Sequence, residues 1–158
     1  MYVDADFATD RRSVSGALVL LAGCVVAWIS RTQTKCVTLS TTEAEYVSMG
    51  DGVKEGQLKE GLFVNDILKF LVPSAKNGKK IEVFEDNEGA IALATNPLSS
   101  GNSKHIDIRH HFLRSLTEDG VLAISHVPSE KQHADILTKA LPRELFQSHR
   151  DFVLGMAS

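Results

Sequence analysis

The longest apolar run of the chain, ALVLLAGCVVAWI at residues 17–29, is interrupted by Gly23. It is shorter than the roughly 18 apolar residues that a membrane-spanning helix needs. Each half has the length and the β-branched and apolar content of a strand, so the run predicts two strands joined by a turn at Ala22–Gly23. Trp28, in the second of these strands, is expected to pack in the core.

The order of the predicted elements around this hairpin indicates an α/β protein with a mixed sheet. In chain order, they are strands at 1–7, 15–21 and 24–30, a helix from about Thr41 to Val72, a strand at 81–84, helices at 87–95 and 105–120, a strand at 121–127, and a last helix that begins at 131 and is interrupted by Pro142. Three antiparallel strands followed by two that arrive through helical crossovers give a five-stranded sheet flanked by helices. The 158 residues suit a single domain over 1–158, with 143–158 as a C-terminal helical tail.

The composition is that of an ordinary globular protein, with 43% hydrophobic and 23% charged residues. Near the N-terminus, Asp4, Asp6 and Asp10 replace the basic residues with which a signal peptide begins. Cys24 and Cys36 lie in apolar, strand-like contexts, which favours buried free thiols in a reducing compartment.

The stretch TEAEYVSMG contains two glutamates that cannot share one face of a helix. Glu43 and Glu45 are two positions apart, which corresponds to about 200° of rotation. A helical projection places Glu45 at the edge of the apolar side, near Met49, and Glu43 on the solvent side. Because an ionised carboxylate against a core is costly, Glu45 needs a cation from the chain or a metal ion. The same helix carries glycines that would let it lie close to the strands where they face inward: Gly50, Gly52, Gly56 and Gly61.

Three further acidic residues lie near the ends of predicted elements. Asp4 lies in the first strand, and Asp86 follows the strand at 81–84, where open α/β sheets place ligand-binding groups. Asp135 lies on the first turns of the predicted last helix, one turn before Lys139. Because the chain has 20 acidic residues, spacing alone leaves two interpretations open: a shared metal site, or unrelated acids in turns and helix caps.

Five blocks along the chain also match the pattern of a known family. They are VDADFATDRRSVSGALV, LSTTEAEYVSM, EDNEGAIALATNP, SKHIDIRHHFLR and HADILTKALPRELF. In this order, from Tyr2 to Phe146, they resemble the ribonuclease H domain that ends the polyprotein of copia-type (pseudoviral) LTR retrotransposons. The resemblance implies a ribonuclease H-like fold, in which four acidic residues hold two divalent ions.

The resemblance assigns these four acids residue by residue. Asp4 matches the aspartate of the first strand, Asp86 the aspartate after the fourth strand, and Asp135 the aspartate of the last helix. The AEYVSM block resembles the A-E-L-x-A pattern, which selects Glu45 and leaves Glu43 as the alternative. Oxygen ligands suit Mg²⁺ or Mn²⁺, and two such ions together promote phosphodiester hydrolysis. The family implies that Asp4 contacts both ions, that Glu45 and Asp86 complete one shell, and that Asp135 completes the other.

The family also implies a catalytic histidine and a substrate contact. Related enzymes place a histidine in the loop before the last helix, and His126 and His133 flank VPSEKQ here. His126 has nearly the expected offset from Asp135, with a structural role at the end of a strand as its alternative. Asn87 matches a substrate-contacting position, whereas the neighbouring Glu88 adds negative charge and argues against tight unaided binding of a nucleic acid.

A basic segment is the candidate contact surface for nucleic acid. The formal net charge is −3, but the distribution of charge matters more than its sum. Residues 104–114, KHIDIRHHFLR, concentrate basic side chains, and Lys104, His111 and Arg114 lie on the polar side of the predicted helix. They form either a ridge that contacts the phosphates of a hybrid or an ordinary solvated helix face.

The sequence therefore predicts a ribonuclease H-type endonuclease that uses two Mg²⁺ or Mn²⁺ ions to cleave the RNA strand of RNA/DNA hybrids during retrotransposon reverse transcription. The expected partners are the hybrid and a reverse transcriptase domain of the same polyprotein. The expected location is the cytoplasm, within a virus-like particle, or the nucleus. Three alternatives are a decayed or domesticated domain that binds nucleic acid or protein, a DNA-cutting relative on the same fold, and a two-carboxylate glycosidase.

Overall fold

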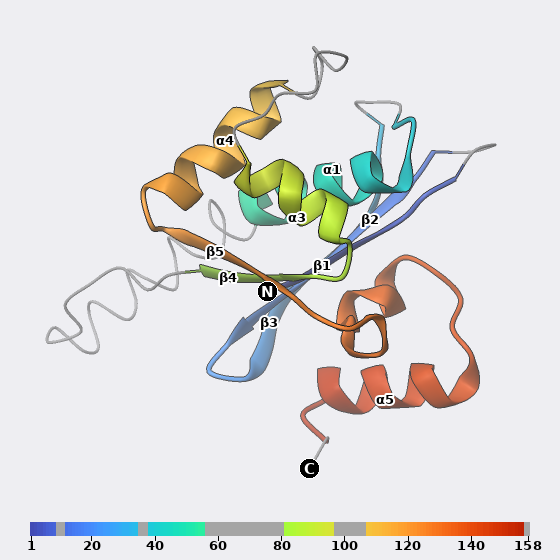
Figure 1. Cartoon of the computed structure of the whole chain (residues 1–158). Helices are drawn as coiled ribbons and strands as arrows, with labels where there is room; N and C mark the ends of the chain where they lie inside the picture. The colour runs from blue at the N-terminus through green and yellow to red at the C-terminus, as the bar shows by residue number, and fades with distance from the viewer. Residues whose placement is uncertain (9–11, 35–37, 56–80, 97–106, 157–158) are drawn as a thin grey trace, which may run out of the picture.

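The computed structural model describes residues 1–8, 12–34, 38–55, 81–96 and 107–156. Figure 1 shows the course of the chain and the labels of its elements. In chain order, these are β1 (Tyr2–Asp6), β2 (Val14–Leu21), β3 (Cys24–Thr32), α1 (Thr41–Glu55), β4 (Ile81–Glu85), α3 (Glu88–Thr95), α4 (Asp107–Glu118), β5 (Leu122–His126), the 3₁₀ helices η2 (Ser129–Lys131) and η3 (His133–Leu137), and α5 (Arg143–Val153).

The five strands form one mixed sheet in the order β3-β2-β1-β4-β5. Strands β1, β2 and β3 are antiparallel neighbours, whereas β4 is parallel to both β1 and β5. The turn between β2 and β3 has positive φ at Ala22 (51°) and Gly23 (84°), as two-residue hairpin turns prefer. The predicted α/β class, the mixed five-stranded sheet and the position of the hairpin turn are therefore confirmed.

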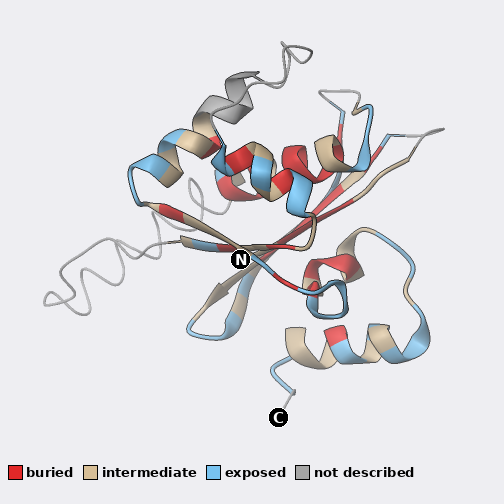
Figure 2. Cartoon of the chain, in the orientation of Figure 1, coloured by how far each residue is buried: buried red, intermediate tan, exposed pale blue. Residues whose placement is uncertain are grey.

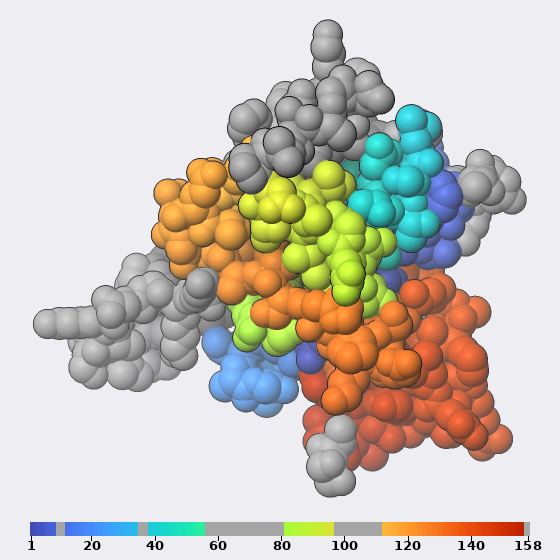
Figure 3. Space-filling view, in the orientation of Figure 1, coloured from blue at the N-terminus to red at the C-terminus, as the bar shows by residue number. Residues whose placement is uncertain are grey.

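Helices α1, α3 and α4 cover one face of the sheet, and η3 and α5 lie against the other (Figure 1). In Figure 3, α4, α3 and α1 lie side by side across the upper part of the visible surface, and the η3–α5 segment lies at the lower right. Helix α1 lies between the sheet and the outer helices, so it is buried over most of its length (Figure 2). The core between these layers consists of Val3, Ala17, Tyr46, Met49, Val53, Val83, Ala90, Ala94, Leu113 and Leu122.

Gly52 allows α1 to lie directly on β1 and β2. A Cβ atom added at Gly52 would lie 3.0 Å from Val3 Cγ1 and 3.1 Å from Ala17 Cβ. At Gly50, the nearest atom would be Leu113 Cδ1 at 3.9 Å, an ordinary van der Waals distance. The predicted close approach of this helix to the strands therefore occurs at Gly52. The rest of the predicted helix, including Gly56, Gly61 and its end at Val72, lies outside the described residues.

The predicted α-helix from residue 131 is wrong. The segment forms η2 and η3 instead, and the last α-helix begins only at Arg143, after Pro142. Tertiary contacts with distant strands hold the segment in this form. The carbonyl oxygen of Leu137, at the end of η3, accepts a hydrogen bond from Ser30 Oγ at 2.7 Å, and the side-chain amide of Gln132, just before η3, donates to the carbonyl oxygen of Val3 at 2.7 Å.

Two expectations for β3 are also wrong. Trp28 is 71% exposed, and Cys24 is exposed as well as free. The reason is that β3 is the edge strand of the sheet, while α1 and η3 pack on its neighbours β1 and β2. Cys36 lies outside the described residues. No helix in the described part of the chain has the length and apolar character to cross a membrane.

We expect Gly52→Ala to lower the free energy of unfolding by about 1–2 kcal/mol, because Val3 Cγ1 in β1 and Ala17 Cβ in β2 would have to move. Gly50→Ala adds the same methyl group two residues earlier, where space exists, and should raise stability by up to about 1 kcal/mol through helix propensity. Urea unfolding followed by circular dichroism measures both. Equal stability of the two variants would contradict the close contact at Gly52.

Candidate metal centre

Three acidic residues from three different elements meet near the carboxyl ends of the central strands β1 and β4. Asp4 lies in β1, Glu45 in α1, and Asp86 directly follows β4; one carboxylate oxygen of each lies within 4.8 Å of the others. Strands β1 and β4 are parallel neighbours, so their carboxyl ends reach the same edge. Asp4 and Glu45 are buried, and Asp86 is half-buried. These oxygens can together contact a single cation.

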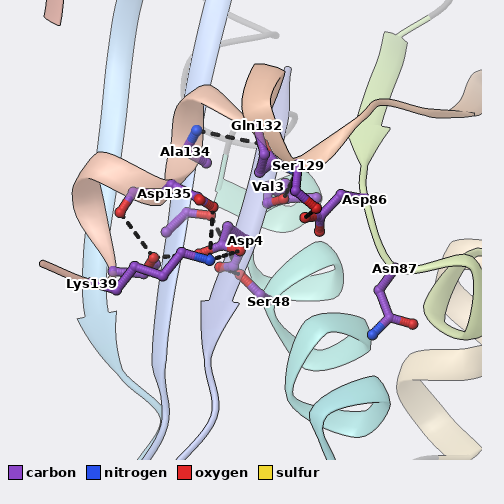
Figure 4. A network of polar contacts seen from close by, with 12 residues as sticks. Val3, Asp4, Ser48, Asp86, Asn87, Ser129, Gln132, Ala134, Asp135 and Lys139 are labelled. Atoms are coloured by element: carbon purple, nitrogen blue, oxygen red, sulfur yellow. Dashed lines mark hydrogen bonds and ion pairs between the residues drawn. The ribbon is translucent and has the colours of Figure 1, made fainter. Parts of the chain in front are cut away.

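Asp135 approaches Asp4 from the other face of the sheet, where η3 lies against β2. Lys139 connects the two: its Nζ atom lies 3.0 Å from Asp135 Oδ1 and 3.5 Å from Asp4 Oδ1 (Figure 4). The hydroxyl of Thr138 donates a hydrogen bond to the other oxygen of Asp4. The structure thus brings together all four acids that the resemblance assigned, with Asp135 linked to Asp4 through an ammonium group.

Hydrogen bonds from neighbouring segments fix this arrangement. Ser48 of α1 donates to the carbonyl oxygen of Asp4 at 2.6 Å, which holds the helix onto β1. Ser129 of η2 donates to Asp86 Oδ2 at 2.7 Å. Both contacts orient backbone or side-chain groups next to the carboxylates, so the cluster is held from α1 and from η2.

Glu85 is a fifth carboxyl group at this site, and the sequence analysis missed it. It is fully buried, and its Oε1 atom accepts a hydrogen bond from the backbone N–H of Asn87 at 3.1 Å. The signal was available in the alternation of β4, since Val83 and Glu85 lie on the same side of the strand and Val83 belongs to the core.

Burial and mutual repulsion disfavour the ionised forms of these acids. Burial, followed by the charges of Glu85 and Asp4, raises the pKa of Glu45 from its ordinary value of 4.5 to about 11. Burial also raises the pKa of Glu85 to about 9, although the hydrogen bond from Asn87 lowers it. Burial and Asp4 raise the pKa of Asp135 to about 7, against the lowering effect of Lys139. A cation at this site would therefore relieve an existing electrostatic cost.

Glu43 lies apart from the other acids and caps α1. Its Oε2 atom accepts a hydrogen bond from the N–H of Leu39 at 2.7 Å, and its own N–H donates to Ser40 Oγ at 3.2 Å. Ser40 is therefore the N-cap residue of this helix. Of the two glutamates in TEAEYVSMG, the structure directs Glu45, and not Glu43, toward Asp4 and Asp86.

The two candidate histidines have different surroundings. His126 is exposed at the end of β5 and pairs with Glu85 in the strand register. His133 stacks on Phe152 of α5, with ring centroids 3.5 Å apart, and its Nδ1 atom lies 3.0 Å from Nδ1 of the buried His149. Burial and His149 lower the pKa of His133 to about 4, so its ring is neutral at neutral pH. His133 therefore serves the packing of α5 against η3.

The candidate substrate contacts are only partly described. Asn87 points away from the carboxylates (Figure 4), and its Oδ1 atom caps α3 by accepting a hydrogen bond from the N–H of Ala90 at 3.0 Å. Arg114 of α4 donates to the carbonyl oxygen of Asn96 at 2.6 Å and so ties α4 to the end of α3. Lys104 lies outside the described residues, and of His111 only the place in α4 is described.

The surroundings of Glu45 indicate what its charge requires. Its Oε2 atom is buried without a hydrogen-bond partner, and among the described residues no lysine or arginine forms an ion pair with Glu45 or Asp86. The two compensations expected for an inward glutamate were a cation from the chain and a metal ion. Asp4, Glu45 and Asp86 offer hard oxygen ligands, so they can bind a divalent metal ion.

We expect the stability of the metal-free protein to depend on Glu45 in a pH-dependent way. The folded protein keeps a proton on Glu45 to about pH 11, whereas the unfolded chain releases it near the ordinary value of 4.5. Above that value the unfolded state binds fewer protons, so a rise in pH lowers stability. Glu45→Gln removes this cost. In EDTA, the stability of the variant relative to that of the wild type should therefore increase between about pH 6 and pH 9. Thermal unfolding followed by circular dichroism measures it, and parallel pH curves would contradict the raised pKa.

Comparison with known proteins identifies relatives among transposon polyproteins. The chain is 36% identical over 160 residues to the retrovirus-related Pol polyprotein from transposon TNT 1-94 of Nicotiana tabacum, covering 99% of the chain and 11% of that protein. It is 36% and 35% identical over 150 residues to those from transposons RE1 and RE2 of Arabidopsis thaliana, covering 93% of the chain and 10% of each relative. The chain thus spans about a tenth of the length of the relatives it matches.

No family model matches the chain. Among solved structures, it is similar to the N-terminal ribonuclease H domain of Rv2228c from Mycobacterium tuberculosis, determined as a fusion with maltose binding protein. The TM-score is 0.55 at 14% identity, and the match covers 95% of this chain and 94% of that one. The fold is therefore that of ribonuclease H, which confirms the predicted fold class. The resemblance that the sequence blocks indicated is also confirmed, because the chain is similar over nearly its whole length to a segment of retrovirus-related Pol polyproteins from transposons.

Proposed function

We propose that residues 1–158 form one ribonuclease H-like domain that cleaves the RNA strand of RNA/DNA hybrids, in a metal-dependent reaction, during reverse transcription of a retrotransposon. The observation that carries this proposal is the meeting of Asp4, Glu45 and Asp86 at the carboxyl edge of β1 and β4. Asp135 lies next to them, across Lys139. Similarity to the retrovirus-related Pol polyprotein of a transposon supports the retrotransposon context of this proposal.

Mg²⁺ or Mn²⁺ is the cofactor that these oxygen ligands favour, and two ions are proposed. Asp4 would contact both, Glu45 and Asp86 would hold one, and Asp135 would hold the other. When bound, such ions supply an activated water and stabilise the leaving oxygen. The chain contributes the arrangement of the ligands: Ser129 fixes the carboxylate of Asp86, and burial keeps Glu45 free of competing water.

His126 is the proposed residue for proton transfer to the departing product. It is exposed at the end of β5, beside Glu85 in the register and therefore at the same edge of the sheet as the acids. His133 is a weaker candidate, because Phe152 and His149 already occupy its ring face and its Nδ1 atom. An exposed imidazole can exchange protons with solvent between turnovers.

The proposed substrate contacts lie on α3 and α4. The oxygen of the Asn87 amide caps α3, so its NH₂ group is the part that can donate a hydrogen bond to a 2′-hydroxyl or to the backbone of a hybrid. Lys104, His111 and Arg114 are proposed as phosphate contacts. The existing hydrogen bond from Arg114 to Asn96 favours an additional role for Arg114 in packing.

The proposed partners are the hybrid and a reverse transcriptase domain of the same polyprotein, in a cytoplasmic virus-like particle or in the nucleus. The relatives are about ten times longer than this chain, which leaves room for such a domain. A second candidate function is a binding module that keeps the fold without cutting. The observation that favours it is the ammonium group of Lys139 on Asp4 and Asp135, which partly neutralises the site without a metal ion.

We expect the protein to cleave a labelled RNA/DNA hybrid in Mg²⁺ or Mn²⁺ and to lose this activity in EDTA. Asp86→Asn should reduce the cleavage rate by at least about 100-fold, since loss of a partner outside the metal shell already costs roughly 10–100-fold. The measurement is the rate of appearance of shortened RNA on a denaturing gel.

The matched control is Glu43→Gln, which removes one negative charge from the same helix as Glu45 but keeps an oxygen that can cap it. It should retain activity close to that of the wild type. Cleavage that survives both EDTA and Asp86→Asn would eliminate the metal-dependent mechanism. Cleavage of duplex DNA in preference to the hybrid would favour a DNA-cutting relative, and a folded protein that binds the hybrid but cuts neither would favour the binding module.

A further inference from the structure

The two halves of the acidic site differ in how their charge is balanced. On the β4 side, Glu45 and Asp86 have no ion pair among the described residues. On the η3 side, Lys139 Nζ lies 3.0 Å from Asp135 and 3.5 Å from Asp4. The site therefore contains one positive charge from the chain, and this charge is not shared equally among the carboxylates.

The oxygens of Asp4 that face η3 already have partners. Thr138 donates to Oδ2, and Lys139 lies next to Oδ1. Asp135 Oδ1 is paired with the same ammonium group, and Asp135 is almost completely buried. The ammonium group of Lys139 lies between Asp4 and Asp135. A cation that contacts both aspartates must therefore come close to this positive charge, and the repulsion between the two costs free energy at such short range.

The ammonium group is able to leave. The side chain of Lys139 is 37% exposed, whereas those of Asp4 and Asp135 are 1% and 5% exposed. Its flexible four-carbon stem can turn the charged end into water while the aspartates stay in place. At the other position, Glu45 and Asp86 each present one oxygen within 4.8 Å of an oxygen of Asp4, and neither forms an ion pair with a lysine or arginine among the described residues.

We propose that Lys139 is an internal counter-ion that makes the two cation positions of the site unequal. The first cation binds at Asp4, Glu45 and Asp86, and a second binds at Asp135 only after the ammonium group has moved away. The inference rests on the proposed metal-dependent function, and it adds an order of binding and the residue that imposes it. It also assigns Lys139 a second task, because the same contacts stabilise η3 against β1 before any cation binds.

The test is a titration of the full chain with Mn²⁺ at constant pH, with free Mn²⁺ followed by electron paramagnetic resonance. The wild type should show a tighter and a weaker binding step. Lys139→Met keeps most of the side-chain length but removes the charge, and it should tighten the weaker step by about three- to tenfold. The tighter step should change less than the weaker one, because only Asp4 among its three ligands forms an ion pair with Lys139.

Lys131→Met is the matched control, since Lys131 is an exposed lysine of η2 that forms no ion pair within the described part of the chain. It removes a lysine charge without removing a contact of Asp4 or Asp135, and it should leave both steps unchanged. Lys139→Gln is measured in parallel, so that the result does not depend on the folding of one variant. In EDTA, both Lys139 variants should unfold at a lower temperature than the wild type, and saturating Mn²⁺ should close this gap.

Two results would overturn the inference: equal affinity of both steps in the wild type, or a weaker step that neither Lys139 substitution tightens. Absence of any Mn²⁺ binding would overturn it as well. Failure of the proposed function is a separate outcome. In that case the protein binds Mn²⁺ in two unequal steps but does not cleave the hybrid. Cleavage with two equal steps would instead leave the function intact and remove the role of Lys139.

Discussion

Glu45 and Glu85 are both buried, and the charge of Glu85 disfavours ionisation of Glu45. Each has one carboxylate oxygen without a hydrogen-bond partner. Ionising both in this position, close to Asp4 and Asp86, is unfavourable because water is excluded and the charges are alike. The protein must therefore hold protons or cations here. This requirement explains why the pKa values of Glu45, Glu85 and Asp135 are raised, and why a lysine lies between Asp4 and Asp135.

The acids can meet because a glycine lies at the point of contact on each face of the sheet, in the helix on one face and in a strand on the other. Gly52 lets α1 approach β1 from one face, and a Cβ atom there would lie 3.0 Å from Val3 Cγ1. Gly16, the register partner of Asp4, does the same on the other face, where a Cβ atom would lie 2.6 Å from Thr138 Cγ2 and 3.2 Å from the carbonyl oxygen of Ala134. Glu45 and Asp135 thus reach Asp4 from opposite directions. The strand between them acts as a common support.

Much of this arrangement was predictable from local sequence. The split apolar run predicts the hairpin, and the helical projection distinguishes Glu45 from Glu43, because each depends on neighbouring residues. The 3₁₀ form of residues 133–137 was not predictable, since it results from Ser30 and Val3 binding backbone and side-chain groups more than 100 positions away. The place of Lys139 follows from that geometry. The exposure of Trp28 depends on the strand order, which no local pattern encodes.

The position of that tryptophan has a practical consequence for spectroscopy. The chain has one tryptophan, and in the folded protein it is 71% exposed on an edge strand. Its indole is therefore largely hydrated before and after denaturation, and its emission maximum should shift little when the core opens. The same fluorophore lies outside the acidic cluster, so it reports little of events there. A blue shift of its emission would instead signal that something had covered the outer side of β3.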